Sequence, residues 1–229
     1  MALNIQKHRI VMINLLKDIV TSPYDKLLWF KWWTLLYLLY NLDRFSTDLD
    51  FDLLWKVDGE KMLNDLSQIC SRYGKVKDLY DKEHTLFLLI DYEHHEMNIK
   101  IEISKKTKKT DTYSYKSILW YQALCMDSDC LFANKLVALT QRKATASRDL
   151  YDIHFFLKNW FAINHEIIKE RTWKSLSEYF KEVLIFIKRH FAENTLLAWL
   201  GELITEKQKI FVKKRLIQET CGYLELMIK

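Results

Sequence analysis

The stretch that decides the fold is "RFSTDLDFDLL", residues 44–54, in which apolar and polar residues take nearly alternate positions. Four apolar residues stand against four polar ones: Phe45, Leu49, Phe51 and Leu53 against Ser46, Asp48, Asp50 and Asp52. Successive side chains of a strand point to opposite faces. This imperfect period of two therefore predicts a strand with one apolar face and one acidic face.

Asp48 and Asp50 are expected on the same face of that strand, roughly 7 Å apart at a rise of about 3.3 Å per residue. Two carboxylates at this separation need a cation. Magnesium is the natural one, because it prefers hard oxygen ligands and is usually held by one or two carboxylates together with substrate phosphates. The spacing alone is equally typical of a solvated acidic strand edge.

The surrounding sequence predicts further helices and strands. Helical spacing of apolar residues marks three segments: 5–20, "TLLYLLYNL" at 34–42, and 58–73. Strands are predicted at "HTLFLLIDY", residues 84–92, and at "MNIKIEISKK", residues 97–106, after which the sheet is expected to end.

From about Asp127 onward, every apolar segment has helical spacing. The order of elements predicts a mixed α+β fold, in which a small mixed sheet with flanking helices precedes a helical domain. We expect the α/β domain over residues 1–125 and the helical domain over 126–229.

The composition is that of an ordinary soluble globular protein: 229 residues, 49% hydrophobic, 28% charged, with a net charge of +5. The N-terminal segment lacks the apolar run of a secretory signal, and residues 27–40 fall short of the roughly 20 apolar residues that span a bilayer. We therefore expect a cytoplasmic protein without a membrane partner. Four scattered cysteines without a CxxC pair predict reduced thiols rather than a zinc site or disulfides.

A third carboxylate stands in the strand predicted at 97–106. Lys100 and Glu102 lie on the face of "NIKIEIS" opposite its isoleucines. Beside Asp48 and Asp50, Glu102 would complete a two-metal site. A routine Lys–Glu pair between strands explains the same pattern without a metal.

Two helical segments carry further charges. Lys135 lies in "ANKLVAL", and "SRDLYDI" contains Arg148, Asp149 and Asp152, the two aspartates being three residues apart on one helix face. Taken alone, such residues are most often charges at helix ends.

Together these segments resemble the AbiEii/AbiGii toxin family of nucleotidyltransferases, a branch of the DNA polymerase β-like superfamily. The family's pattern is Gly-Gly-Thr after a strand, Arg-x-Ser-x-Asp-Leu-Asp-Phe, a strand with a charged or acidic position, Lys-x-x-Ala-x-x-x-Arg and Arg-Asp-x-x-Asp. The matching segments are "RFSTDLDF" at 44–51, "KIEI" from Lys100, "KLVALTQR" at 135–142 and "RDLYD" at 148–152. The resemblance covers most of the chain, and four ordered matches are far more specific than Asp-x-Asp alone.

The resemblance implies nucleotidyl transfer from a nucleoside triphosphate. Magnesium would be bound in a two-metal site by Asp48 and Asp50, with Glu102 as the third carboxylate. Lys135 would reach the triphosphate as a fourth catalytic residue. Asp152 is expected to organise its helix rather than bind metal. The positions that the resemblance assigns to substrate binding are Trp32, Trp33, Thr34, Ser46, Arg148 and Asp149.

The same resemblance implies partners. A toxin of this type pairs with a separately encoded antitoxin and is expected to modify or hold a nucleic-acid or nucleotide target. Some relatives modify transfer RNA, which makes RNA one candidate acceptor. The lysines of "SKKTKKT", residues 104–110, could hold an RNA backbone through phosphate contacts or form a solvated hairpin.

One segment departs from the family's pattern. "FKWWT", residues 30–34, stands where the family has Phe-Lys-Gly-Gly-Thr. The two glycines let backbone amides approach phosphates, which requires the absence of a side chain. The indoles of Trp32 and Trp33 are expected to obstruct this approach, so one interpretation is a catalytically degenerate binding protein that keeps the fold.

The composition offers a second interpretation. The chain has 4 glycines and 8 tryptophans, although glycine usually makes up about 7% of residues. Other tryptophans also stand where a turn or a helix end would favour glycine: Trp29, Trp173 and Trp199. If the source organism reads UGA as glycine, its own protein carries glycine at 32 and 33. The remaining alternative is that both tryptophans are authentic core aromatics.

Overall fold

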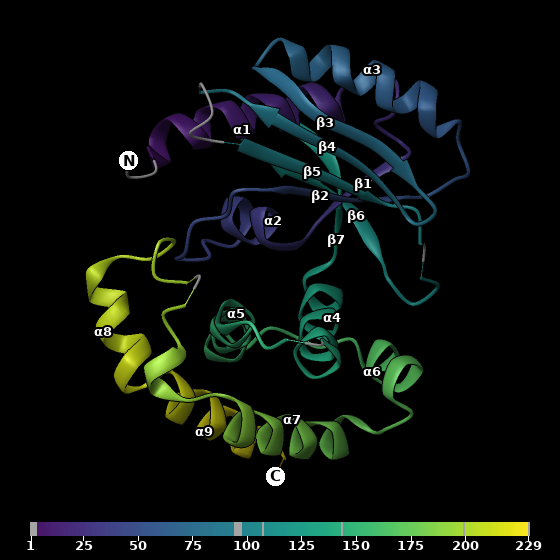
Figure 1. The fold of residues 1–229 in the computed structure, drawn as a ribbon. Helices are drawn as coiled ribbons and strands as arrows, with labels where there is room; N and C mark the ends of the chain where they lie inside the picture. Colours follow the sequence, from purple (N-terminus) through teal and green to yellow (C-terminus); the bar gives the residue numbers. More distant parts are fainter. Residues whose placement is uncertain (1–3, 94–97, 107, 143, 199, 229) are drawn as a thin grey trace. The chain divides into compact units, whose positions relative to one another are not determined.

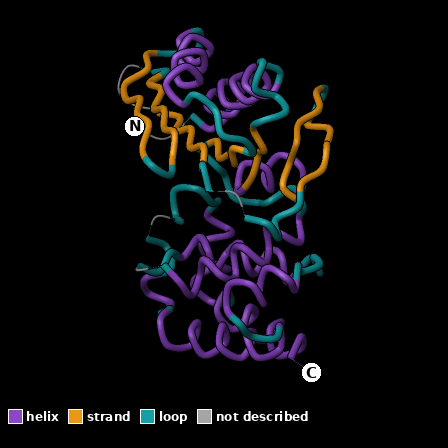
Figure 2. Tube along the Cα trace, turned by 90° about the vertical axis from the view of Figure 1, so that its right-hand side faces the viewer, coloured by secondary structure: helices purple, strands orange, loops and turns teal. Residues whose placement is uncertain are grey.

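The computed structural model describes residues 4–93, 98–106, 108–142, 144–198 and 200–228. The chain forms two compact units. The sheet unit comprises Met1–Asn41, Phe45–Lys109 and Tyr113–Met126, and the helical unit comprises Leu42–Arg44, Thr110–Thr112 and Asp127–Lys229. Figure 2 shows the strands, in orange, gathered in the sheet unit.

Seven strands of the described chain form one mixed sheet in the order β3-β4-β5-β2-β1-β7-β6. Their bounds are β1 Leu28–Lys31, β2 Leu49–Leu53, β3 Lys75–Lys82, β4 Thr85–Asp91, β5 Asn98–Ser104, β6 Tyr113–Ile118 and β7 Tyr121–Met126. Strand β2 runs parallel to β5 and antiparallel to β1, while β1 runs parallel to β7. The predicted α+β fold is confirmed.

Three helices belong to the sheet unit: α1 Ile5–Val20, α2 Trp32–Leu39 and α3 Gly59–Ser71. Helices α1 and α3 cover one face of the sheet (Figure 1). Each begins with a side-chain cap, because Asn4 accepts from the Lys7 N–H and Asp58 accepts from the Lys61 N–H. The helix predicted over 5–20 is confirmed at both ends, and the one predicted over 58–73 is shorter by a residue or two at each end.

The stretch at 44–54 forms a shorter strand than its alternation suggested, since β2 begins at Leu49. Its apolar set is buried as predicted: Phe45, Leu49, Phe51 and Leu53. Residues 44–48 form the irregular segment that leads into the strand. Met97, where the next predicted strand began, lies outside the described residues, and β5 starts at Asn98.

The prediction that the sheet ends after residue 106 is wrong, because β6 and β7 extend it beyond β1. Strand β6 lies at one edge of the sheet and leaves most of its side chains partly or fully exposed, including Tyr115 at 60%. Strand β3, at the opposite edge, is similarly exposed. Edge strands of this kind bury no complete apolar face, so the apolar alternation that marks inner strands is weak in them.

The helical unit consists of helices connected by short segments. Their bounds are α4 Ser128–Gln141, α5 Ser147–Lys158, α6 His165–Thr172, α7 Leu176–His190, a short 3₁₀ turn Glu193–Thr195, α8 Glu206–Lys214 and α9 Leu216–Ile228. Helix α7 opens with a capping box between Ser175 and Glu178. Helix α4 is buried almost all round, whereas α7 and α9 pack together with apolar stripes.

Candidate functional site

Strand β2 places its acidic residues between two neighbouring strands. In the register of the sheet, Asp50 lies opposite Lys31 of β1 on one side and opposite Glu102 of β5 on the other. Asp48 comes one residue before β2 and shares the face of Asp50, because side chains two apart point the same way. The structure thus brings together Asp48, Asp50 and Glu102, which we call the acidic site.

Lys100 is the cation of the acidic site. Its Nζ lies 3.4 Å from Asp48 Oδ2 and 3.3 Å from Glu102 Oε2. Burial lowers the pKa of Lys100, but Asp48 and Glu102 outweigh it and raise the pKa above its ordinary value. One ammonium is therefore shared by Glu102 of β5 and by Asp48, which immediately precedes β2.

Asp50 is the carboxylate of the acidic site that is most affected by burial and by a neighbouring like charge. Burial, and after it the charge of Asp48, raise the pKa of Asp50 to about 7, although Lys31 and Lys100 act in the opposite direction. Near neutral pH the side chain is divided between its charged and neutral forms. An added positive charge at this point would keep Asp50 ionised.

Asp52, the third aspartate of the strand, has a different environment. Lys31 Nζ lies 2.6 Å from its Oδ1, and the Tyr113 hydroxyl donates to its Oδ2 at 2.6 Å. Both oxygens are engaged and the side chain is buried. Lys31 was not predicted as a site residue, although its place beside the acidic strand could have indicated it.

Thr34 and Ser46, predicted as substrate-binding residues, are buried beneath the start of β2. The Thr34 hydroxyl lies 2.9 Å from Ser46 Oγ and contacts the backbone carbonyl of Asp48. In the same segment, His8 Nε2 lies 3.0 Å from the carbonyl of Thr47. These contacts fix the backbone on which Asp48 stands.

The tryptophans lie beside the acidic site. Trp32 is the first residue of α2 and lines a small hollow of about 150 Å³. The hollow is lined by Lys31, Trp32, Asp50, Phe51, Thr85, Glu102 and Ser104. The rings of Trp32 and Trp33 are 5.5 Å apart. The Trp32 indole thus stands at the same hollow as two of the carboxylates. Trp29, which we expected at a turn or a helix end, lies inside β1.

The helical unit holds a second cluster of charges, which we call the ion network. Lys135 Nζ lies 2.5 Å from Asp149 Oδ1 and 3.1 Å from Asp152 Oδ2. Arg44 binds both oxygens of Asp152, at 2.6 and 2.8 Å, and Arg142 lies 2.8 Å from Asp149 Oδ2. All of these side chains except that of Arg142 are almost fully buried.

The ion network encloses Lys135, the residue predicted to reach a triphosphate. Its side chain is 0% exposed. Burial lowers the pKa of Lys135 to about 8, with Asp152 and Asp149 acting in the opposite direction. Burial raises the pKa of Asp149, but Lys135 and Arg142 outweigh it and hold that pKa below its ordinary value.

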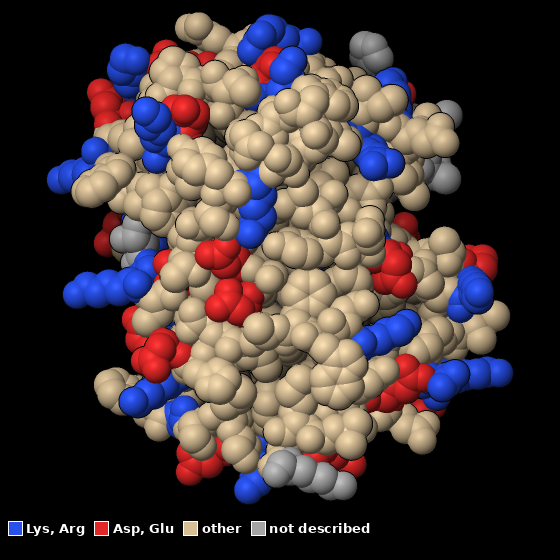
Figure 3. Space-filling model, turned by 180° about the vertical axis from the view of Figure 1, so that it is seen from behind, with Lys and Arg blue, Asp and Glu red and all other residues tan. Residues whose placement is uncertain are grey.

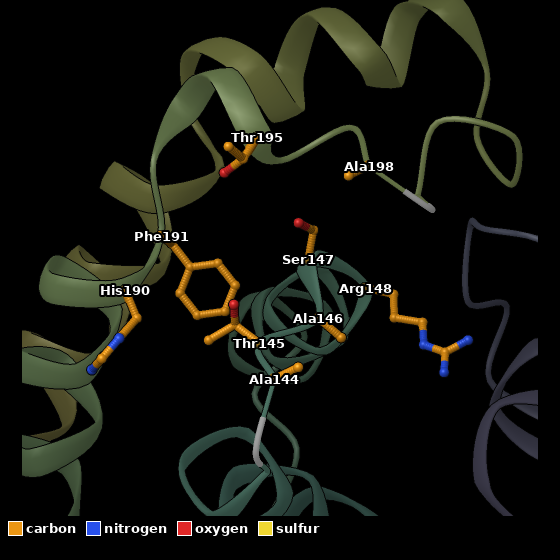
Figure 4. A pocket seen from close by; sticks show the side chains of 9 residues that line it. All are labelled: Ala144, Thr145, Ala146, Ser147, Arg148, His190, Phe191, Thr195 and Ala198. Carbon is orange, nitrogen blue, oxygen red and sulfur yellow. The ribbon is translucent and has the colours of Figure 1, made fainter.

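Arg148, also predicted to bind substrate, is exposed in the first turn of α5. It lines a cavity of about 490 Å³ within the helical unit. Figure 4 shows Ser147 and Arg148 at this helix start, with His190 and Phe191 from the end of α7. The structure therefore separates Arg148 from its neighbour Asp149, which points into the ion network.

Magnesium is a partial fit to the acidic site. In the described residues, no three acidic, histidine or cysteine side chains converge as a ready-made metal cage. Asp48 and Asp50 nevertheless supply hard oxygens, and burial, followed by the charge of Asp48, raises the pKa of Asp50, which a bound cation would lower. Magnesium rarely needs an all-protein cage and is usually bound by one or two carboxylates and substrate phosphates.

A family model described as the nucleotidyl transferase AbiEii toxin of type IV toxin–antitoxin systems matches residues 14–219. The chain belongs to the AbiEii family. Among solved structures, JHP933 from Helicobacter pylori has a TM-score of 0.64 at 21% identity, with 100% of this chain and 94% of that chain covered. A putative nucleotidyltransferase from H. pylori has a TM-score of 0.60 at 20% identity, with 99% of both chains covered.

These two structures show that the AbiEii chain shares its fold with proteins of low sequence identity. A search of curated proteins found no match. No helix in the described ranges combines the length and the hydropathy that crossing a bilayer requires.

Proposed function

We propose that this AbiEii-family protein transfers a nucleotide from a nucleoside triphosphate to an acceptor hydroxyl in a magnesium-dependent reaction at the acidic site. The observation that carries the proposal is the position of Asp50, flanked in the sheet by Glu102 and by Lys31, with its pKa raised to about 7. Carboxylates that are short of positive charge favour binding of a cation.

In this proposal, Asp48 and Asp50 hold magnesium and Glu102 is the third carboxylate, as in a two-metal site. The metal would neutralise charge on the triphosphate as the acceptor oxygen bonds to the α-phosphorus and pyrophosphate departs. Lys100 sits where it would be displaced from Asp48 and Glu102, and its ammonium would then be available to a phosphate oxygen. Thr34 and Ser46 keep the Asp48 backbone in place.

Lys135, Arg148 and Asp149 remain predicted substrate-site residues through the family pattern. A triphosphate that reached Lys135 would compete with Asp149 and Asp152 for its ammonium. Arg148, by contrast, is exposed at the start of α5.

The partners are proposed from the family. A type IV toxin implies a separately encoded antitoxin, and we propose RNA as the acceptor class, encountered in the cytoplasm. Lys106, Lys108 and Lys109 are exposed beyond β5, whereas Lys105 forms an ion pair with Asp81. On the face shown in Figure 3, blue and red side chains are interspersed, so any RNA contact on that face would involve scattered lysines and arginines rather than a continuous stripe.

Substitution at the acidic site tests the proposal. We expect Asp48→Asn and Asp50→Asn to lower transfer of labelled nucleotide into RNA by roughly 100-fold or more, because each removes a charged metal ligand. Asp78→Asn, an exposed position on β3, is the matched control and should retain activity. Undiminished transfer by the Asp50→Asn protein would contradict the metal assignment.

A second candidate function is binding without catalysis, by a degenerate member of the family that keeps the fold. It is favoured by Trp32, whose indole lines the hollow beside Asp50 and Glu102. Calorimetric titration with a nucleoside triphosphate and magnesium, before and after the combined change Trp32→Gly and Trp33→Gly, separates the two functions. Magnesium-dependent binding only after the change supports obstruction by the indoles. No binding in either protein supports the degenerate alternative.

A further inference from the structure

Three tryptophans have an unusual backbone conformation. Among the described residues other than glycine, φ is positive at five positions: Trp32 (66°), Asn41 (56°), Leu119 (55°), Trp160 (54°) and Trp173 (59°). Only a few per cent of non-glycine residues adopt this left-handed region, and asparagine is among those that tolerate it. For a residue as bulky as tryptophan it is a genuine outlier.

The glycines show the opposite behaviour. All four glycines of the chain lie in the described ranges, and none has a positive φ. Trp199 lies outside the described residues, and three of the other seven tryptophans have positive φ. Glycine, the residue best suited to a positive φ, is thus absent from these positions, and tryptophan, the largest residue, occupies three of them.

Trp160 follows helix α5 at a position typical of glycine. Its N–H donates to the Leu157 carbonyl at 3.1 Å, and the Phe161 N–H donates to the Phe156 carbonyl at 3.1 Å. This pair of bonds is the Schellman motif, in which the left-handed residue is usually glycine. The Trp160 side chain is 64% exposed, so its burial gives little compensation for the strain.

Trp173 ends helix α6 in the simpler left-handed motif. Its N–H donates to the Lys169 carbonyl at 3.0 Å, the single bond that defines this ending. The side chain is 90% exposed. An indole in water offers no packing reason for a tryptophan here, whereas the backbone gives a direct reason for glycine.

Trp32 stands at the junction where β1 ends and α2 begins, with φ changing from −143° at Lys31 to 66°. The three positions lie in three different connections and share no sequence motif. No single local structure explains tryptophan at all three positions, whereas the way in which the gene's codons are read would explain all of them.

We infer that positions 32, 160 and 173 are glycine in the protein that the source cell makes, because their codons are UGA and that cell reads UGA as glycine. The printed sequence gives those codons as tryptophan. The inference rests on backbone geometry and holds whether or not the acidic site is catalytic.

The protein as printed allows a test of the geometric step. Trp173→Gly and Trp173→Ala both remove the indole, but only alanine keeps a Cβ in the left-handed conformation. We expect the glycine variant to melt about 2–4 °C above the alanine variant. Trp55, which is 68% exposed without a positive φ, is the control, and there the alanine variant should be at least as stable. Equal melting temperatures at position 173 would overturn the geometric step.

The decisive experiment is to sequence the gene in its source genome, and to identify these residues by peptide mass spectrometry of protein from that organism. We expect UGA at codons 32, 160 and 173, and glycine in the peptides. A UGG codon at any of these three positions, or tryptophan in the peptides, would overturn the inference.

Discussion

The acidic site and the ion network are both built from carboxylates and cations, but carboxylates outnumber cations in the first and cations outnumber carboxylates in the second. The acidic site has three carboxylates, Asp48, Asp50 and Glu102, and Lys100 forms ion pairs with the first and the last of them. The ion network has two carboxylates held by three cations, Lys135, Arg44 and Arg142. The first is short of positive charge and partly exposed, which suits a ligand-binding role. In the second, both carboxylates are paired with cations and all side chains except that of Arg142 are largely buried, which suits a structural role.

The largest expected effect comes from breaking the ion network. Asp152→Asn would leave Arg44 and Lys135 buried with one carboxylate fewer, so we expect the free energy of unfolding to fall by about 3 kcal/mol. Urea denaturation measures this loss. The matched variant is Asp50→Asn, which removes an aspartate of the acidic site and should not destabilise the protein at pH 8. If the two variants lost equal stability, the distinction between a structural and a ligand-binding cluster would fail.

A smaller effect is expected from the pH dependence of Asp50. Its folded pKa of about 7 lies above the ordinary value of 3.8, so the native state binds the proton more tightly than the unfolded state. This contribution to stability is present at low pH and is lost as pH rises through about 7. The Asp50→Asn protein has no ionisable group at this position, so its free energy of unfolding does not fall for this reason as the pH rises.

The measurement is the difference in unfolding free energy between Asp50→Asn and the unmodified protein at pH 5.5 and at pH 8. We expect it to shift by on the order of 2 kcal/mol in favour of the variant at pH 8. Taking the difference cancels the titration of other groups. A difference that stays constant over this range would mean that Asp50 titrates normally.

The smallest expected effect concerns Lys100, the competing cation. Lys100→Gln removes the ammonium between Asp48 and Glu102. Magnesium affinity should then rise roughly fivefold, corresponding to about 1 kcal/mol for one exposed charge pair in water. Calorimetric titration with magnesium chloride measures it, with Lys56→Gln as an exposed control. Unchanged or weaker binding by Lys100→Gln would argue against competition for the same carboxylates.

The parts of the fold that were predictable are those with a complete apolar face. Helix α1 and the buried residues of β2 follow directly from their periods. Strands β3 and β6 lie at the edges, where exposure removes the pattern that marks a strand. Their place in the sheet depends on pairing between distant segments, which local periodicity does not encode.

The three carboxylates of the acidic site were predictable from the sequence. Polar and apolar residues alternate in both segments, so Asp48 and Asp50 share one face of their segment and Glu102 lies on the polar face of its own. The sheet register then makes the three residues neighbours. The partners of Asp52 were not predictable, because Tyr113 reaches it from 61 residues away. The enclosure of Lys135 also depends on how α4 and α5 pack, which the spacing of its own segment does not determine.

The most direct test of the central claim, that the acidic site binds a nucleotide with magnesium, starts from the Trp32→Gly, Trp33→Gly protein. Its affinity for a nucleoside triphosphate is measured by calorimetry with and without magnesium, and again after adding Asp50→Asn or the control Asp78→Asn. We predict magnesium-dependent binding that Asp50→Asn abolishes and Asp78→Asn preserves, and little recovery when only one glycine is introduced. Equal affinity in the starting, Asp50→Asn and Asp78→Asn proteins would contradict the account.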